Sequence, residues 1–204
     1  EFAELMSREA ALTSDQARKE VQAAIDRCVY YCGWADKFGA VYGSVNPVSA
    51  SYFDFSVPEP TGVVGVVADE GTPLIGLVSQ AMPAIVCGNT CVAIASGRFP
   101  LTALEFGEVL ATSDLPGGVV NLLTGEKAEL LPPLARHMDV NAIGYRDGDR
   151  ATEEELADLG TEHLKRVRFH ARRPRNWWLT DAAQGPEWIE EFTETKTVWH
   201  PVGV

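Results

Sequence analysis

Four cysteines carry the most versatile chemistry in this sequence, since a thiol can attack a carbonyl carbon or ligate a metal ion. They form two pairs with i,i+4 spacing, Cys28 with Cys32 and Cys87 with Cys91. No His or further Cys stands at a spacing that would complete a metal site, and both pairs lie among apolar residues. We therefore expect no metal, cysteines packed in the core, and a reducing, cytoplasmic setting.

A second candidate site is a cluster of basic residues late in the chain. Its members are Lys165, Arg166, Arg168, Arg172, Arg173 and Arg175. The cluster could bind an anion or face an acidic subunit, and the simpler interpretation is a charged strand end in contact with water. The whole chain has 17 Lys and Arg against 29 Asp and Glu, a formal charge of -12. Because this field repels phosphates and anionic headgroups, we expect neither nucleic acid nor a membrane as partner.

The elements that must position these residues alternate between strand and helix. Short apolar runs predict strands, and each is followed by a segment of helical periodicity. The predicted strands are 62–67, 91–95, 119–123, 142–145 and 164–169, and the predicted helices are 73–86, 100–111, 127–137 and 152–159. Strands buried on both faces and joined through helices require parallel, right-handed crossovers. We therefore expect an α/β fold, a doubly wound parallel sheet of about five strands.

Segments outside this alternation flank the sheet. A capping box from Thr13 to Gln16 predicts the start of a long amphipathic helix that ends near Gly39. Alternating residues between positions 41 and 60 predict a hairpin. Beyond Pro174 we expect a linker, a short helix and a last strand. This tail contains several tryptophans that would need covering: Trp177, Trp178, Trp188 and Trp199.

These segments give the expected domain organisation. It comprises an N-terminal helical segment (1–40), a β hairpin (41–58), the sheet domain (59–173) and a linker with a C-terminal strand (174–204). No apolar run approaches the roughly 20 residues of a membrane helix, and residues 1–8 do not resemble a signal peptide. The first residues look like the middle of a helix, so we expect missing N-terminal residues or a module of a longer polypeptide.

An ordered set of motifs in this sequence resembles those of a known family. The motifs are Glu59-Pro60-Thr61-Gly62-Val63-Val64-Gly65-Val66-Val67, Pro73-Leu74, Ala84 to Thr90, Pro100 to Leu104, and Leu115 to Gly125. In order and spacing they resemble the nucleotide-binding domain of the aldehyde dehydrogenase family, over about two thirds of the chain. Gly62-x-x-Gly65 alone is weak evidence for a nucleotide site, so the interpretation depends on the whole set. The resemblance implies a Rossmann-like sheet.

The tail carries a separate resemblance to the same family. Residues 192–198 are similar to the family's C-terminal strand, which belongs to a small oligomerisation sheet. The resemblance implies these oligomerisation residues: Thr195, Lys196, Thr197, Val198 and Trp199. Where the family has its large catalytic domain, this chain has only the short segment between Pro174 and Pro186. The resemblance therefore implies that this domain and its nucleophilic cysteine are absent.

The remaining family motifs are altered at chemically important positions. Gly71 stands where an Asn of the family donates to the oxyanion, a loss that typically costs about 10² to 10³ in rate. Ile94 and Gly97 stand where a Lys and a Glu hold the adenosine ribose, and Asp147 stands where a turn approaches the pyrophosphate. A carboxylate there would repel phosphate. His170 stands at the general-base position but has no reaction to assist without a nucleophile.

Together these features predict a non-catalytic, aldehyde dehydrogenase-like subunit without a cofactor. We expect it to be a structural or regulatory partner in an oligomer, either with a full-length aldehyde dehydrogenase or with copies of itself. The former is favoured, because the family's oligomerisation sheet docks on a catalytic domain that this chain does not offer to a copy. The alternative is an NAD-binding oxidoreductase subunit that takes part in aldehyde oxidation with catalytic residues from a partner.

Overall fold

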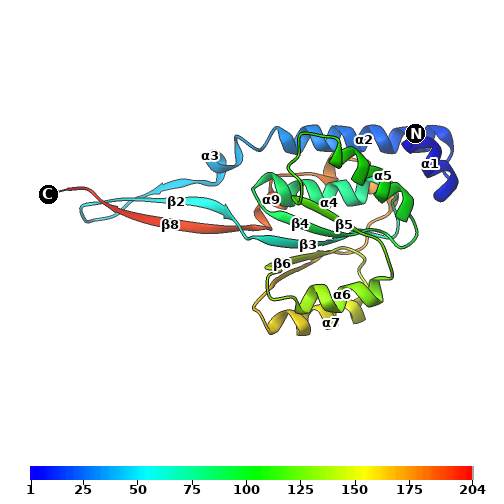
Figure 1. Ribbon diagram of the computed structural model, residues 1–204. Helices are drawn as coiled ribbons and strands as arrows, with labels where there is room; N and C mark the ends of the chain where they lie inside the picture. Colours follow the sequence, from blue (N-terminus) through cyan, green and yellow to red (C-terminus); the bar gives the residue numbers. More distant parts are fainter. Residues whose placement is uncertain (204) are drawn as a thin grey trace.

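A sheet of five parallel strands forms the centre of the computed structural model, which describes residues 1–203 (Figure 1). The strands are β3 (Val63–Val67), β4 (Thr90–Ile94), β5 (Val120–Leu123), β6 (Ala142–Tyr145) and β7 (Arg166–Phe169). Their order is β5-β4-β3-β6-β7, and each neighbouring pair is parallel. The chain therefore winds outward from β3 in one direction and through β6 in the other, which confirms the predicted doubly wound sheet.

Helices cover both faces of the sheet (Figure 1). On one face lie α4 (Ile75–Val86) and α5 (Pro100–Ala111), and on the other lie α6 (Lys127–Arg136) and α7 (Arg150–Thr161). α2 (Ser14–Cys32) packs on α4, and α1 (Phe2–Glu9) packs on α2 and α5. This layered arrangement confirms the α/β, Rossmann-like fold class. Among residues 1–203, no helix is both long and apolar enough to span a membrane.

The central strands are continuous apolar runs because both of their faces are covered. Val64 and Val67 are fully buried, and all four residues of β6 are buried. Gly65 in β3 allows a close approach of α6, since a Cβ at this position would lie 2.8 Å from Cδ2 of Leu134. A larger residue at position 65 would therefore push α6 away from the sheet.

The N-terminal helices follow the sequence prediction at their start and depart from it at their end. Thr13 forms the predicted capping box with Gln16. The helix does not continue to Gly39 but ends at Cys32, and after a turn the chain forms α3 (Phe38–Tyr42). Gly33 follows the last helical residue, and its amide bonds back to the carbonyl of Val29. Glycine has a low helix propensity, which explains the earlier end.

A three-stranded antiparallel sheet extends away from the main body (Figure 1). It consists of β1 (Ser44–Asn46), β2 (Tyr52–Pro60) and β8 (Thr193–Pro201) in that order. The pairing of β2 with β8 runs from Tyr52 opposite Pro201 to Pro60 opposite Thr193. The predicted hairpin is therefore β1 with β2, and the predicted last strand is β8. β8 runs toward the far tip of this extension (Figure 1).

The segment between β7 and β8 folds back onto the main body. It forms α8 (Arg175–Trp178), a 3₁₀ turn (Asp181–Ala183) and α9 (Glu187–Glu190), where the sequence predicted one short helix. Trp178 and Trp188 are 1% and 7% exposed, so these tryptophans are covered by the chain itself and not by a partner. Trp199 in β8 remains 58% exposed. The expectation that the tryptophans need an external cover is therefore wrong for Trp178 and Trp188.

The four cysteines are free thiols with different exposure. Cys91 is buried, and burial raises the pKa of its thiol to about 12. Cys28 and Cys87 are half-buried, and burial raises the pKa of each to about 11. Cys32 is exposed at the end of α2, so the prediction of core packing is wrong for this residue. Cys32 is the second of the two cysteines of α2, and it faces solvent.

Candidate functional site

The candidate site lies at the carboxyl edge of the five-stranded sheet. In doubly wound sheets ligands bind at this edge, at the point where the winding direction reverses. Here the reversal falls between β3 and β6. The loops after these strands carry Glu70 and Asp147, the loop after β4 carries Ser96, and Lys127 begins α6 nearby. Sequence positions from four separate strand ends therefore meet in one place.

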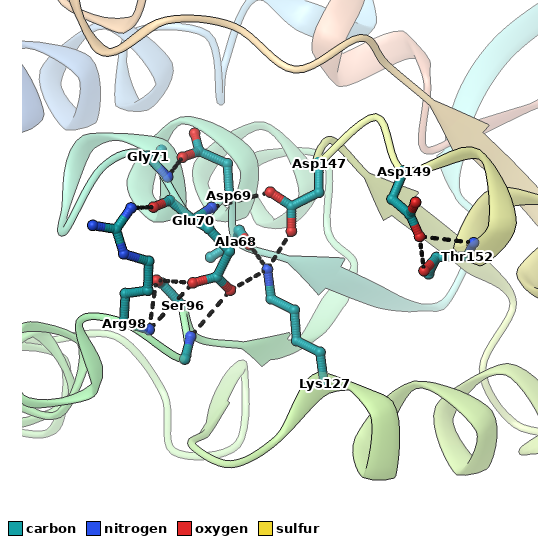
Figure 2. Close-up of polar contacts among 12 residues, drawn as sticks. Ala68, Asp69, Glu70, Gly71, Ser96, Arg98, Lys127, Asp147, Asp149 and Thr152 are labelled. Atoms are coloured by element: carbon teal, nitrogen blue, oxygen red, sulfur yellow. Dashed lines mark hydrogen bonds and ion pairs between the residues drawn. The ribbon is translucent and has the colours of Figure 1, made fainter.

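Lys127 is the centre of a cluster of charged groups at this edge (Figure 2). Its Nζ lies 2.5 Å from Oδ2 of Asp147 and 2.6 Å from Oε1 of Glu70. It also donates to the backbone carbonyl of Ala68 at 2.5 Å. Asp147 in turn accepts a hydrogen bond from the amide of Glu70 at 3.0 Å. The ammonium group thus has three oxygen partners from its own chain, which matches its three donors.

The side chain of Glu70 contacts the loop that follows β4 (Figure 2). Its carboxylate accepts from the hydroxyl of Ser96 at 2.6 Å and from the amides of Gly97 and Arg98 at 3.1 and 3.2 Å. Burial alone raises the pKa of Glu70, but the hydrogen bonds from Lys127 and Ser96 outweigh it and leave the pKa below its ordinary value. The carboxylate is therefore ionised and acts as an internal anion on these amides.

Asp69 shapes the turn that leads from β3 to α4. Its Oδ1 accepts from the amides of Gly71 and Thr72 at 2.5 and 3.0 Å. The side chain is buried, and this burial raises the pKa of Asp69 to about 6, with a further rise from nearby Asp147. Burial and the nearby carboxylate of Asp147 thus both disfavour the charged form of Asp69.

The N-terminus of α4 is also capped by a carboxylate of the chain. Oε1 of Glu20, from α2, accepts from the amides of Leu74 and Ile75 at 3.0 and 3.2 Å. Glu20 is fully buried, and its other oxygen accepts from Arg175 at 2.7 Å. A helix N-terminus at this edge is a place where other proteins bind phosphate. Here a glutamate of α2 occupies it.

Two more helix N-termini show the same arrangement. Glu9 of α1 accepts from the amides of Leu101 and Thr102 in the first turn of α5, at 2.7 and 3.0 Å. Asp149 accepts from the amide of Thr152 in the first turn of α7, at 3.1 Å. The helices that begin after β3, β4 and β6 are therefore all capped by side chains of this chain.

His170 lies apart from the Lys127 cluster, at the end of β7. Its amide donates to the carbonyl of Tyr145 at 3.0 Å, and its Nε2 lies 3.0 Å from Oε2 of Glu191. The same carboxylate oxygen lies 3.3 Å from the guanidinium of Arg146. Arg146 is buried over the ring of Trp188, and this burial lowers its pKa to about 10.

The basic cluster predicted from sequence is not simply a strand end in water. Lys165 donates to the carbonyl of Val140 at 2.5 Å, and Arg166 donates to the carbonyl of Thr193 at 2.6 Å. Arg175 pairs with Glu20, as described above. Arg168, Arg172 and Arg173 are exposed. Arg166 and Arg175 therefore tie the tail to the main body, whereas Lys165 bonds within the main body.

The structure brings together only some of the residues that the sequence singled out. Asp147 and Gly97 both contact the Glu70 and Lys127 cluster. Gly71 lies beside it and contributes only its backbone amide. Ile94 is a fully buried residue of β4, and His170 faces Glu191.

No role was predicted for Lys127, Glu20 or Glu9 from the sequence. One signal for Lys127 was available. A lysine in the first turn of a helix opposes the helix dipole, which suggests a special partner for its charge. No local signal identified Glu20 and Glu9, because their partners are 54 and 92 residues away in sequence.

The fold and these motifs agree with a comparison to known protein families. The sequence model of the Aldehyde dehydrogenase family matches residues 1–171, and the chain belongs to this family. The match ends before the tail, so the resemblance of residues 192–198 to the family's last strand stays a prediction. Among residues 1–203, no three His, Cys, Asp or Glu side chains are placed to share a metal ion.

Several members of this family and their solved structures are similar to this chain over part of their length. Retinal dehydrogenase 2 from Mus musculus is 33% identical over 148 residues, which cover 72% of this chain and 28% of the relative. "Aldehyde dehydrogenase, cytosolic 1" from Elephantulus edwardii is 30% identical and covers 81% of this chain and 35% of the relative. The crystal structure of PnpE from Pseudomonas sp. WBC-3 has a TM-score of 0.77 at 30% identity, covering 82% of this chain and 34% of PnpE. The chain spans about a third of the length of these relatives.

The residues at the carboxyl edge do not fit NAD, the cofactor of a solved PnpE complex. A pyrophosphate needs free amides or cations at this edge. In this chain the amides of Gly97 and Arg98 donate to Glu70, and Lys127 is shared between two carboxylates. Ile94, at the position where the family motif holds the ribose, is buried and has no polar group.

Proposed function

We propose that this chain is a non-catalytic subunit of an aldehyde dehydrogenase oligomer, with a structural or regulatory role. One observation carries the proposal: Glu70, Lys127 and Asp147 bond to one another and to the backbone at the edge where the fold would receive a nucleotide. Because side chains of the chain already satisfy the amides and the lysine at this edge, a nucleotide would have to displace them in order to bind. We therefore propose that the subunit works without a cofactor.

The cysteines support the absence of a catalytic role. A nucleophilic thiol requires a lowered pKa and a place beside the reacting carbon. Burial raises the pKa of Cys28, Cys87 and Cys91 instead, to between about 11 and 12. Cys91 lies near the amino end of β4 and Cys32 on α2, whereas Gly71 and His170 lie at the carboxyl edge. None of these thiols is placed beside the residues at the family's oxyanion and general-base positions.

The extension formed by β1, β2 and β8 supports a protein partner. Its apolar side chains include exposed Val45, Tyr52, Phe53 and Trp199, which are 69%, 44%, 46% and 58% exposed. Beyond its pairing with β2, β8 has a second edge, and long exposed edges of this kind call for a pairing partner. We propose that Thr195 to Trp199 contact a full-length aldehyde dehydrogenase, in the cytoplasm.

Native mass spectrometry tests this partner. The chain, mixed with a full-length aldehyde dehydrogenase from the same organism, is expected to give a heteromeric species, because the partner supplies the catalytic domain on which β8 docks. Trp199→Glu should abolish this species by placing a charge in the contact. Leu164→Glu changes a residue that is 94% exposed between α7 and β7, far from the extension in sequence, and should leave the species intact.

Other outcomes would contradict the proposal. A chain that forms only homomers would remove the case for a full-length partner. A heteromer equally sensitive to both substitutions would place the contact somewhere other than β8.

The second candidate is an NAD-binding subunit that takes part in aldehyde oxidation with a partner's catalytic residues. The 30% identity to PnpE, which was solved in complex with nicotinamide adenine dinucleotide, favours this candidate. It requires that Glu70 and Lys127 separate when the nucleotide arrives. Saturable NAD binding by the chain would support this second candidate. The contacts among Glu70, Lys127 and Asp147 at the carboxyl edge favour the first candidate.

A further inference from the structure

A small cavity lies beside the ends of β6 and β7, on the side where the tail folds back. Its volume is about 180 Å³, and it is lined by Arg146, His170, Ala171, Arg173, Trp177, Trp178, Ala182 and Trp188. At about 30 Å³ for each water in the liquid, this is room for roughly six water molecules. Most of the lining comes from residues 171–188, nearly all of them beyond the part that the family model matches.

The cavity has more positive charge than its own chain neutralises. Arg146 and Arg173 both line it, and within residues 1–203 the carboxylate that pairs with a lining arginine is Glu191. Glu191 is shared with His170. Arg173 is exposed and has no ion pair in the described part of the chain, so its guanidinium is available to an anionic ligand that replaces water. A monoanion would balance the charge of this guanidinium.

Both guanidinium groups are held in an orientation that leaves donors free. Arg146 lies 3.9 Å from the ring centroid of Trp188, and Arg173 lies 5.1 Å from that of Trp177. Stacking uses the flat face of a guanidinium, while its five N–H donors point outward in the plane. Among residues 1–203, the side-chain hydrogen bond of Arg146 is the one to Glu191. Arg146 is 6% exposed, and its other donors face the open cavity, where a ligand could replace water as their acceptor.

The remaining walls are aromatic. The indoles of Trp177 and Trp188 are within 20° of parallel, with centroids 6.1 Å apart, and Trp178 meets both edge-on. The Nε1 of Trp178 is buried without a hydrogen-bond partner in the described residues. Because Arg146 and Arg173 cover the faces of Trp188 and Trp177, the cavity exposes mainly polar groups. A guanidinium matches a carboxylate through paired N–H donors.

We propose that this cavity binds a small monocarboxylate, with benzoate as the probe. The carboxylate accepts from Arg146 and Arg173. This inference does not depend on the proposed function, because the cavity and the Lys127 cluster share no residue.

Benzoate titration of the purified chain, followed by calorimetry and tryptophan fluorescence, tests the proposal. Benzamide has nearly the same shape without the charge and should bind at least about tenfold more weakly. Arg173→Ala should weaken benzoate binding by roughly tenfold, because it removes a charged donor. Arg172→Ala changes the neighbouring exposed arginine, which does not line the cavity, and should change affinity by less than about twofold.

Three results would overturn the proposal. Benzoate and benzamide could bind equally well, which would show that charge is not recognised. Arg173→Ala and Arg172→Ala could have the same effect, which would place the anion elsewhere on the basic surface. Benzoate could also fail to saturate the chain up to about 10 mM, an affinity too weak for a built site.

Discussion

At the scale of single residues, Glu70 does for the backbone what a bound phosphate does in nucleotide-binding proteins. Its carboxylate accepts from the amides of Gly97 and Arg98 and pairs with Lys127. A negative group at this position satisfies donors that would otherwise need water or a ligand. Because the anion belongs to the chain, we propose that it competes with any nucleotide.

Asp69 predicts a measurable pH dependence of stability. Its pKa is raised from 3.8 to about 6 in the folded chain, chiefly by burial. The folded protein therefore binds more protons than the unfolded chain between these two pH values, and the contribution of Asp69 to the unfolding free energy falls as pH rises across that window. The loss amounts to about 2 to 3 kcal/mol.

The variant Asp69→Asn removes this titration and keeps an oxygen that can accept from Gly71 and Thr72. Relative to the wild type, its unfolding free energy should rise with pH across the same window. Urea unfolding at several pH values measures the difference. A difference that does not change with pH would show that Asp69 ionises normally.

Replacing Glu20 by glutamine should greatly reduce the free energy of unfolding, although the two side chains have nearly the same shape. Glu20→Gln leaves Arg175 without its anion and weakens the cap on α4, in a fully buried position. Breaking a buried pair in this way costs about 3 to 5 kcal/mol. Glu9→Gln makes the same change at the half-buried cap of α5 and should cost about 1 kcal/mol. Equal losses in thermal or urea unfolding would contradict the assigned role of Glu20.

At the scale of elements, the tail between β7 and β8 behaves as part of the core. Arg27 of α2 donates to the carbonyls of Trp178, Thr180 and Ala183 and so fixes the tail on the helix layer. Phe192 approaches Gly144 of β6, where a Cβ would lie 3.0 Å from its ring. The tail therefore covers the part of the sheet that α4 and α5 leave open.

A buried and an exposed tryptophan of the C-terminal segment should contribute very differently to stability. Trp178→Ala removes a side chain that is 1% exposed and should reduce the unfolding free energy by about 3 to 5 kcal/mol. Trp199→Ala removes one that is 58% exposed in β8 and should cost about 1 kcal/mol or less. Circular dichroism during urea unfolding measures both. Similar small losses would mean that the tail is only loosely attached.

The elements that sequence predicted best are those encoded locally. The buried run of β3 and the capping box of Thr13 each depend on neighbouring residues, and both were found as predicted. The helix from Pro100 to Ala111 was found with the predicted bounds. The end of α2 was misplaced, because several apolar residues continue the helical pattern past Gly33.

The contacts that build the site could not be predicted in the same way. Asp147 was singled out for its charge, but its partners Glu70 and Lys127 come from other strand ends and meet only in the folded sheet. The tail was predicted as a linker, because Arg27 and the carbonyl of Ala183 are 156 residues apart in sequence. Interactions of this range leave no periodic pattern.

At the scale of the whole molecule, the chain combines the sheet of the aldehyde dehydrogenase family with a saturated ligand edge and an exposed extension. Its formal charge of -12 also disfavours a free dinucleotide, which is itself an anion. The extension exposes Val45, Tyr52, Phe53 and Trp199, and the helices α2 and α5 of the main body expose apolar side chains as well. These features support our proposal of a subunit that contributes surface to an oligomer.

The most direct measurement is a calorimetric titration of the purified chain with NAD, with PnpE as the positive control. Because Glu70, Lys127 and Asp147 satisfy one another, we predict no saturable heat, and any dissociation constant should be weaker than about 1 mM. A dissociation constant in the low micromolar range for the chain alone would contradict the central claim that its own side chains fill the nucleotide edge.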